Sequence, residues 1–442
     1  MLLSFSFSGF RSFGDEAILD LTSHSLRTNV PRKDQTWTEC TERVAAIYGP
    51  NASGKTTLLN AIWALASAIR RPETTTIFQP CSGRQCADPV SEYRVDFVAH
   101  GIRYHYEVEA HSWGIGKEAL YSFPHGAKRL LFTRTQAGKG EKLQFSKGSS
   151  LSGPTAEVLK ITQPRALYLA TANRYGHKTL APIAQGICAS VGIEKISFRD
   201  AQDVDVIKRV IMEMLATPDE QADLVRALIQ AGDLGIEQID IRYEEIPDEI
   251  RQRVIQFVEA LREGDENLST DDVPRLQDKI VFVHHGENGS TFELPLGSQS
   301  SGTLTWLTIA WHALNAIRGG SVLLVDELDA SLHPELVRYV VNLFASSELN
   351  TTGAQLIFTT HDVSLLGNSP TRLLQPRNVW FVEKDNTGNS ELFSLDDFDN
   401  RPGNNSERRY MAGQFGAVPD IDDGLLYDFV TTPSSDPEQD HE

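Results

Sequence analysis

The sequence predicts an α/β fold with a mixed sheet core, an antiparallel β subdomain and a helical insertion. Three observations predict it. A glycine-rich loop follows a short apolar strand and opens a helix within residues 43–70. Apolar, β-rich segments at 321–327, 354–361 and 378–384 have helical segments between them, which is typical of a parallel sheet covered by helices. Alternating apolar residues on both sides of His100-Gly101 predict a hairpin with one buried face.

The remaining elements follow in chain order. Two opening strands, near 3–7 and 17–21, flank the turn "GFRSFGDE", and further strands continue to about residue 147. From 203 to 261 apolar residues recur at spacings of three and four, which predicts helices; the polar linker "GDENLSTDD" and a second hairpin, "KIVFVHHGENGSTFELPL", follow. We therefore divide the chain into a first lobe (1–198), an acidic helical insertion (199–275), a second lobe (276–428) and a disordered tail (429–442).

The composition is that of a soluble globular protein, with 442 residues of which 40% are apolar and 23% charged. No apolar run approaches the roughly 20 residues that cross a bilayer, so we expect no membrane association. The opening "MLLSFSFSGFRSFGDE" lacks the basic region of a signal peptide. Four cysteines predict reduced thiols and a cytoplasmic location, and Cys81 and Cys86 have no second pair to complete a zinc site.

The charge is strongly acidic and unevenly distributed. A net charge of −19 repels nucleic acid overall, so any such binding must be local. Residues 117–178 carry 11 Lys and Arg against 3 acids, whereas 200–275 carry 20 acids against 8 bases. The basic stretch is either an ordinary solvated surface or a patch for DNA or an acidic partner.

A phosphate-binding loop is the most specific motif. "GPNASGKT", from Gly49 to Thr56, has the spacing in which glycines let backbone N–H groups point at phosphate oxygens. The Lys55 ammonium can reach the β and γ oxygens, and the Thr56 hydroxyl can hold Mg²⁺. The candidate nucleotide-binding residues of this loop are Gly49, Pro50, Asn51, Ala52, Ser53, Gly54, Lys55, Thr56 and Thr57.

Two strand ends carry polar side chains suited to phosphate chemistry. In "SVLLVDELDASLHPE", Asp326 can hold Mg²⁺ through water and Glu327 can polarise an attacking water as general base. Helix capping is the alternative for such an acidic pair. "LIFTTHD" ends a further strand at His361, where a γ-phosphate contact is expected, although a single histidine is more often structural.

A second anion site is indicated by "LGSQSSGTLTWL", residues 296–307. A serine-rich loop that runs into a helix presents N–H groups and hydroxyls with the helix dipole behind them. Taken alone, the segment is equally well a plain helix N-cap. A chain that already has a phosphate loop near residue 50 would then carry two phosphate-binding elements.

In order, "GPNASGKTT", "SQSSGT", "LLVDELDASLHP" and "FTTHD" resemble the ATP-binding cassette superfamily, in the branch with heads like those of SMC and RecF proteins. The closest resemblance is to stand-alone AAA family ATPases related to overcoming-lysogenisation-defect proteins, many of them components of anti-phage systems. The segments "FSGFRSFGDE" and "RRYMAGQFGAVPDI" match that group too. In this family the serine-glycine signature closes over the γ-phosphate bound by a second subunit. The resemblance therefore implies ATP and Mg²⁺ as cofactors and a homodimer, or higher homo-oligomer, with shared ATP sites.

The resemblance also implies roles for individual residues. Lys55 and Thr56 bind phosphate and magnesium, Asp326 assists the metal, and Glu327 is the water-activating base. His361 is the switch histidine. Residues Asp329 to His333 form the D-loop, in which His333 replaces the aspartate of many relatives. The remaining candidates are Ser300, Ser301 and Gly302 as the trans-acting signature, Arg11 as a nucleotide contact, and Gln79 as the Q-loop and a metal-site residue.

Two functions are compatible with these residues. The first is an ATPase that acts as the sensor of an anti-phage, abortive-infection system and controls a separate effector, such as a nuclease or toxin. Only 59 residues follow Glu383, too few for the Toprim domain of nuclease relatives, so we do not expect a nuclease. The acidic insertion is then the candidate for docking the effector. The alternative is a DNA-repair ATPase of the RecF or SMC type that grips DNA through 117–178; a transport ATPase is disfavoured because the signature and insertion differ.

Overall fold

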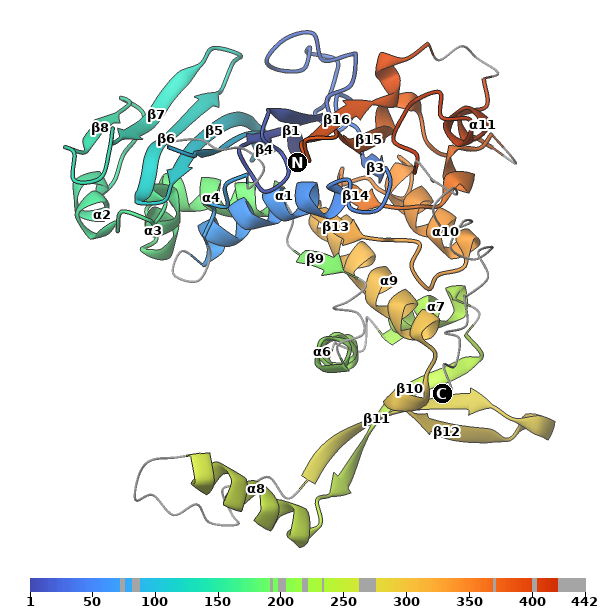
Figure 1. Ribbon diagram of the computed structural model, residues 1–442. Helices are drawn as coiled ribbons and strands as arrows, with labels where there is room; N and C mark the ends of the chain where they lie inside the picture. The colour runs from blue at the N-terminus through green and yellow to red at the C-terminus, as the bar shows by residue number, and fades with distance from the viewer. Residues whose placement is uncertain are drawn as a thin grey trace, which may run out of the picture.

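The computed structural model describes residues 1–71, 76–81, 88–190, 194–197, 204–216, 222–232, 234–261, 276–368, 371–399 and 404–419. Within these residues the chain forms three sheets connected by helices (Figure 1). The α/β fold class is confirmed, with a mixed sheet that carries the phosphate loop and a separate antiparallel sheet. The predicted tail, the linker "GDENLSTDD" and Cys86 lie outside the described residues.

The central sheet has six strands in the order β16-β15-β3-β14-β13-β9. All neighbours run parallel except β16, which pairs antiparallel with β15. The strands are β3 (Val44–Tyr48), β9 (Glu194–Ser197), β13 (Val322–Asp326), β14 (Gln355–Thr359), β15 (Val379–Lys384) and β16 (Ser390–Ser394). Because β3 lies between β14 and β15, the two predicted lobes share this one sheet.

The central sheet is buried on both faces, which explains its continuous apolar runs. Along β3, Val44, Ala46 and Tyr48 belong to one hydrophobic cluster and Ala45 and Ile47 to the other, as the two-residue period of a strand requires. One face is covered by α1 (Lys55–Arg70), and α9 (Ser301–Gly319) and α10 (Pro334–Ala345) cover the other (Figure 1).

The antiparallel sheet has seven strands in the order β2-β1-β4-β5-β6-β7-β8 and contributes to the same core as α1. Its strands are β1 (Leu2–Ser8), β2 (Ala17–Asp20), β4 (Ser91–Ala99), β5 (Ile102–His111), β6 (Gly114–Phe123), β7 (Arg129–Thr135) and β8 (Gln144–Lys147). The predicted opening strands and the hairpin at His100-Gly101 are confirmed, and both turn residues have positive φ, as a two-residue hairpin turn requires. Three helices pack beneath it: α2 (Thr155–Ile161), α3 (Tyr168–Arg174) and α4 (Leu180–Ser190).

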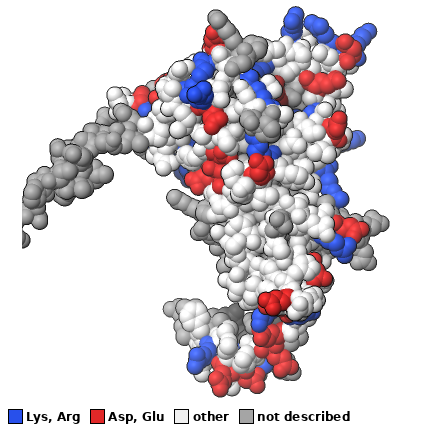
Figure 2. Space-filling view, turned by 90° about the vertical axis from the view of Figure 1, so that its right-hand side faces the viewer, with Lys and Arg blue, Asp and Glu red and all other residues white. Residues whose placement is uncertain are grey.

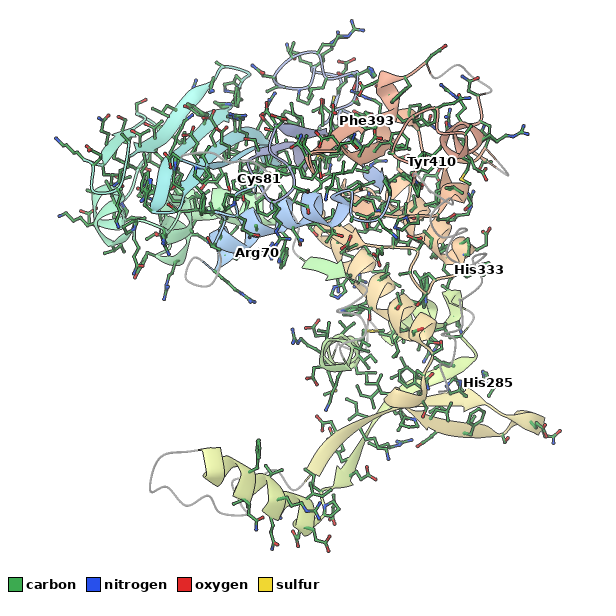
Figure 3. The ribbon with its side chains drawn as sticks, viewed as in Figure 1. Arg70, Cys81, His285, His333, Phe393 and Tyr410 are labelled. Carbon is green, nitrogen blue, oxygen red and sulfur yellow. The ribbon has the colours of Figure 1, made fainter. Side chains whose placement is uncertain are left out.

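A buried glutamine joins the two large sheets. Gln355, 1% exposed, accepts a hydrogen bond from the Leu2 N–H (2.7 Å) and donates to the carbonyls of Leu2 (2.9 Å) and Glu42 (3.0 Å). Aromatic packing fixes the other side of β3, because Phe381 stacks on Tyr410 in α11 (Ser406–Met411) and Tyr410 contacts Tyr48 edge-on. Figure 3 labels Tyr410 beside α11. The strand β3, which precedes the phosphate loop, is thus fixed by contacts with segments more than 300 residues later in the chain.

The insertion differs from its prediction in one respect. Helices occur where the periodicity predicts them, as α6 (Val204–Leu215), α7 (Ala222–Ala231) and α8 (Asp248–Leu261). Between α7 and α8, however, the chain forms β10 (Ile236–Glu245), which pairs with the predicted hairpin β11 (Leu276–His285) and β12 (Thr291–Pro295). This third sheet and α8 lie at the far end of the molecule from the seven-stranded sheet (Figure 1). Among the described helices, none is long and apolar enough to span a membrane.

Candidate nucleotide-binding site

The phosphate loop connects the buried strand β3 to the first turn of α1. Its backbone has positive φ at Gly49 (150°), Ala52 (62°) and Gly54 (121°), and a side chain is excluded at both glycines. A Cβ at Gly49 would lie 2.2 Å from the Val382 carbonyl oxygen, and one at Gly54 would lie 2.7 Å from Ser390 Oγ. Only glycine fits these two positions, so the loop is shaped by close contact with β15 and β16.

The Lys55 side chain folds over this loop. Its Nζ donates to the carbonyls of Gly49 (2.7 Å) and Pro50 (3.0 Å). Burial lowers the pKa of the Lys55 ammonium, while the carboxylates of Asp326 and Glu327 oppose that shift. The Lys55 ammonium and the two carboxylates therefore lie close enough for their charges to interact.

Asp326 joins three elements at the carboxyl end of β13. Its Oδ1 accepts hydrogen bonds from the hydroxyl of Thr56 at the start of α1 (3.1 Å) and from that of Thr359 at the end of β14 (2.8 Å). The carboxylate is 7% exposed. A hydroxyl and a carboxylate oxygen at this spacing are hard oxygen donors, the ligand type that Mg²⁺ prefers. The structure thus brings together Thr56 and Asp326, each of which the sequence predicts as a magnesium-site residue.

Glu327 adopts a left-handed backbone conformation, with φ of 57°. Such a conformation costs on the order of 1–3 kcal/mol in a non-glycine residue and needs compensating contacts. One is visible: the Glu327 N–H donates to Thr359 Oγ1 at 2.7 Å. The Thr359 hydroxyl therefore accepts from Glu327 and donates to Asp326, and it positions both predicted acidic residues.

His361 lies on the same side of the sheet. Its backbone N–H donates to both carboxylate oxygens of Asp329, each at 3.2 Å, which links His361 to the predicted D-loop. Burial, followed by the charge of Lys55, lowers the pKa of the His361 imidazole, although Asp329 and Glu327 oppose this. This shift favours the neutral imidazole, which has one N–H donor.

These side chains surround a cavity of about 240 Å³. The sequence identified most of its walls but missed Ser12, Thr359 and Lys384, which stand next to motif residues or at the end of a strand. Proximity to the motif could have indicated Thr359, two residues before His361. The lining residues are Arg11, Ser12, Asn51, Ala52, Ser53, Gly54, Lys55, Thr56, Thr57, Asp326, Glu327, Thr359, His361 and Lys384.

Gln79 does not line this cavity. Its Oε1 accepts from Arg11 Nε (2.8 Å), and its carbonyl accepts from the Arg11 N–H (2.9 Å). Arg11 itself lines the cavity and has a positive φ of 52°. The structure thus places Gln79 behind Arg11 and outside the described lining of the cavity.

The signature residues also lie outside the cavity wall. Ser300 caps α9, with its Oγ accepting from the Thr303 N–H at 3.0 Å, and Ser301 is exposed. A Cβ at Gly302 would lie 2.8 Å from the Ser331 carbonyl oxygen, so the start of α9 contacts the D-loop of the same chain. At the end of that loop His333 caps α10 by accepting from the Glu335 N–H at 3.2 Å (Figure 3).

A phosphate loop between a parallel strand and a helix, with Asp326 and Glu327 at the end of another parallel strand of the same sheet, defines this protein as a P-loop NTPase. A sequence model of the family described as "AAA domain, putative AbiEii toxin, Type IV TA system" matches residues 44–171 and 213–367, well over half of the chain. The chain belongs to this family of AAA ATPases.

Two solved structures that resemble this chain are Smc head domains. One is an Smc head bound to the C-winged helix domain of ScpA, with 12% identity, a TM-score of 0.34, and coverage of 89% of this chain and 97% of that one. The other is from Pyrococcus furiosus, an Smc head with an extended coiled coil bound to the C-terminal domain of ScpA. It has 11% identity, a TM-score of 0.35, and coverage of 89% and 96%. No curated protein matches the chain.

Proposed function

We propose that this chain is an ATPase that dimerises around ATP and controls a separate effector in an anti-phage defence system. The loop from Gly49 to Thr57 would hold the phosphates, with Thr56 and Asp326 holding Mg²⁺. Their oxygens, 3.1 Å apart, fit a small cation that prefers oxygen ligands. Glu327 would act as general base on the attacking water, and the neutral His361 would donate a hydrogen bond to the γ-phosphate.

The observation that carries the proposal is the division of the site. The loop, the acidic pair and His361 share one cavity, whereas Ser300 to Gly302 contribute nothing to its lining and stand at an exposed helix start. An exposed helix N-terminus with hydroxyls is suited to bind the phosphate of another copy. Head-to-tail pairing of two chains would give two composite sites, each with the loop of one copy and the signature of the other.

The proposed control of an effector is supported by α8. Ile250, Val254 and Phe257 lie at spacings of four and three on this helix and are 51%, 42% and 66% exposed. Figure 1 shows α8 apart from the ATPase core, and Figure 2 shows Asp and Glu gathered at that end of the molecule. An apolar stripe beside acidic residues favours a protein partner with a basic rim around an apolar groove. The family description, which names a toxin–antitoxin system, supports a defence role.

The DNA-binding alternative has less support, because part of the basic stretch is already neutralised. Lys117 pairs with Glu107 at 2.8 Å and with Glu109 at 3.4 Å. Arg134 is 2% exposed and lies 3.6 Å from Glu118. A cation that is already paired with a carboxylate is less able to neutralise a phosphate of a nucleic acid. Fewer Lys and Arg side chains of residues 117–178 are therefore available for a nucleic-acid backbone than the sequence suggests.

The proposal is tested by the solution mass of the Glu327→Gln protein, measured by light scattering with and without ATP and Mg²⁺. Loss of the base should trap ATP, and the mass should double when ATP is added. Adding Ser301→Arg should abolish the increase because the bulky cation blocks docking, whereas Ser347→Arg, at an exposed site after α10, should not. A mass that does not respond to ATP, or responds equally in both arginine variants, would contradict the proposal.

A further inference from the structure

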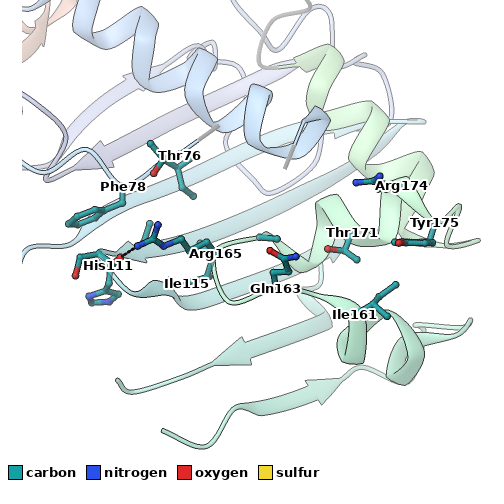
Figure 4. A pocket seen from close by; sticks show the side chains of 15 residues that line it. Thr76, Phe78, His111, Ile115, Ile161, Gln163, Arg165, Thr171, Arg174 and Tyr175 are labelled. Carbon is teal, nitrogen blue, oxygen red and sulfur yellow. Dashed lines mark hydrogen bonds between the residues drawn. The ribbon is translucent and has the colours of Figure 1, made fainter. Parts of the chain in front are cut away.

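The cations that line the cavities of this protein differ in how they are engaged. In a larger cavity of about 740 Å³, between the seven-stranded sheet and its helices, Arg165 donates to a backbone carbonyl at 2.9 Å (Figure 4). In the nucleotide cavity, Lys55 donates to its own loop and Arg11 donates to Gln79. Lys384 lines the nucleotide cavity too, yet within the described chain no hydrogen bond or ion pair engages its ammonium. Lys384 is therefore available to a ligand of that cavity.

The direction of the Lys384 side chain follows from its strand. Trp380 and Val382 on β15 belong to the hydrophobic cluster that contains α1. Because residues two apart on a strand face the same way, Lys384 points to the side of the sheet on which α1 begins. Its partner on β16 points there as well, since the Ser390 hydroxyl donates to the Ser53 carbonyl in the phosphate loop. The Lys384 ammonium thus lies on the same side of the sheet as the phosphate loop.

A second cation is held at the same end of the cavity. The hydroxyls of Ser12 and Ser390 lie 2.9 Å apart, and the Ser390 N–H donates to the Ser12 carbonyl at 2.7 Å. Arg11, the residue before Ser12, also lines the cavity. Since Ser390 is the strand partner of Lys384, Arg11 and Lys384 stand on neighbouring segments, and their positive charges add at this end.

The opposite end of the cavity is acidic. Asp326 and Glu327 stand at the end of β13, whereas Lys384 ends β15, and both β3 and β14 lie between these strands. Three strand intervals separate the two backbone positions by about 14 Å. Of the described residues that line the cavity, Asp326 and Glu327 are the only carboxylates. A bound nucleotide therefore meets acidic side chains at one end and basic side chains at the other.

We propose that Lys384 binds the α-phosphate of the nucleotide, with Arg11 beside it. This inference rests on the proposed ATPase function, in which Thr56 and Asp326 hold Mg²⁺ between the β- and γ-phosphates. Lys55 also serves the β and γ oxygens, so no charged side chain of the loop is left for the α-phosphate. A lysine ammonium binds phosphate as a point charge, and Lys384 supplies one at the basic end. Lys384 thus sets nucleotide affinity and takes no part in breaking the bond to the γ-phosphate.

The assignment is tested by calorimetry with ATP and ADP in the presence of Mg²⁺, using the whole chain with Glu327→Gln as the parent protein. Adding Lys384→Ala should weaken both nucleotides by the same factor, roughly tenfold, as for a lost charged hydrogen bond. Lys384→Arg keeps the charge and should retain most of the affinity. Lys147→Ala, at an exposed lysine outside the cavity lining, should bind as the parent does.

Steady-state hydrolysis provides a second measurement, in the protein that keeps Glu327. Lys384→Ala should raise KM and leave kcat within about twofold, because a contact with the α-phosphate is equally strong in the ground state and the transition state.

Thiophosphate analogues identify the phosphate that Lys384 contacts. Sulfur in place of a non-bridging α oxygen weakens a lysine contact, so one diastereomer of ATPαS should bind the parent less tightly than ATP does. This difference should disappear in Lys384→Ala, as for two changes that remove the same interaction. The corresponding difference between ATPβS and ATP should remain.

Three results would overturn the assignment. Unchanged affinity of Lys384→Ala for both nucleotides would make Lys384 an ordinary surface lysine, and a loss for ATP alone would place it at the γ-phosphate. An α-thio difference that is absent from the parent, or that persists in Lys384→Ala, would place the α-phosphate elsewhere. Melting temperatures of the variants separate lost binding from lost folding.

The same data separate this inference from the proposed function. If the parent binds neither ATP nor ADP, the proposed ATPase function fails and the role of Lys384 fails with it. If the parent binds both and Lys384→Ala changes neither affinity, only the role of Lys384 fails.

Discussion

The nucleotide cavity and the signature segment of the same chain differ in how complete they are. In the cavity, Asp326 at the end of β13 accepts hydrogen bonds from Thr56 at the start of α1 and from Thr359 at the end of β14. The Thr359 hydroxyl in turn accepts from the Glu327 N–H. At the signature, the Ser300 hydroxyl serves its own helix and Ser301 is exposed. The cavity is organised by the fold, whereas the proposed signature is exposed and could contact a second molecule. The difference teaches that two segments with the composition of phosphate-binding elements can differ in how far their own chain completes them.

The largest expected effect is on the organised half. Glu327→Gln should lower the rate of ATP hydrolysis by about 10²–10⁴-fold, because it removes the proposed general base, while ATP still binds. Phosphate release and equilibrium binding of ATP measure the two quantities separately. The exposed Glu348→Gln is the matched control and should keep the normal rate. An unchanged rate in Glu327→Gln would remove Glu327 from the chemistry.

The signature half should give the next largest effect. Ser301→Ala removes one donor without adding bulk, and loss of a donor to transition-state charge costs about 10²–10³-fold in rate. ATP affinity of the isolated chain should stay unchanged, since Ser301 lies outside its own cavity. Steady-state hydrolysis measures the first and calorimetry at low protein concentration the second. Ser347→Ala is the control, and equal rates in both variants would reduce residues 300–302 to a helix cap.

Thr359 tests whether hydrogen bonds behind the metal ligands organise the cavity. Thr359→Val keeps the shape but removes the hydroxyl that donates to Asp326 and accepts from Glu327. Loss of such an orienting bond typically costs about 10–100-fold in metal affinity, so the Mg²⁺ concentration for half-maximal hydrolysis should rise by that factor. Thr308→Val, equally buried within α9, should leave it unchanged. A normal Mg²⁺ requirement in Thr359→Val would contradict this role.

The smallest effect on catalysis is expected far from both halves, at His105 on the seven-stranded sheet. Burial alone would lower its pKa, but hydrogen bonds to Asp96 (2.8 Å) and Glu107 (2.9 Å) outweigh burial and raise the pKa to about 9. Arg103 and Lys117 complete this network. Since the folded pKa exceeds the unfolded value near 6.5, the stabilisation is complete below about pH 6.5 and is lost as the pH rises through 9.

Accordingly, His105→Gln should lower the free energy of unfolding by about 2–3 kcal/mol near pH 6 and by little above pH 9.5. Urea unfolding at several pH values measures this difference, with the exposed His125→Gln as control. ATP hydrolysis per folded molecule should not change. A deficit that grows with pH would mean that the imidazole is neutral in the folded protein.

The phosphate loop and the positions of Asp326, Glu327 and His361 beside it could be predicted from sequence, because each follows a short apolar strand. The phosphate loop requires positive φ at Gly49 and Gly54, and glycines at this spacing can be recognised within eight consecutive residues. The strands that lead to Asp326 and His361 are recognised in the sequence as short apolar runs. Parallel strands of one sheet have their carboxyl ends at the same edge, so these residues lie close together. Thr359 was missed because its role depends on a hydrogen bond to a strand 33 residues away in sequence.

Features that depend on contacts between residues far apart in the sequence could not be predicted in this way. The segment of β10 was assigned to a helical insertion, yet it pairs from Ile236 to Glu245 with β11, some 30–50 residues later. The place of Gln79 outside the cavity lining depends in the same way on a hydrogen bond from Arg11, 68 residues earlier.

The division of the site between two copies is tested most directly by mixing two inactive proteins. In a mixed dimer of Lys55→Ala and Ser301→Ala, one composite site combines an intact loop with an intact signature. At equal amounts about one quarter of the normal hydrolysis rate should return, because half of the dimers are mixed and each has one working site. Lys55→Ala mixed with Glu327→Gln, both in the same half, should stay inactive. If the first mixture also stays inactive, the signature does not act on a second molecule and the account is wrong.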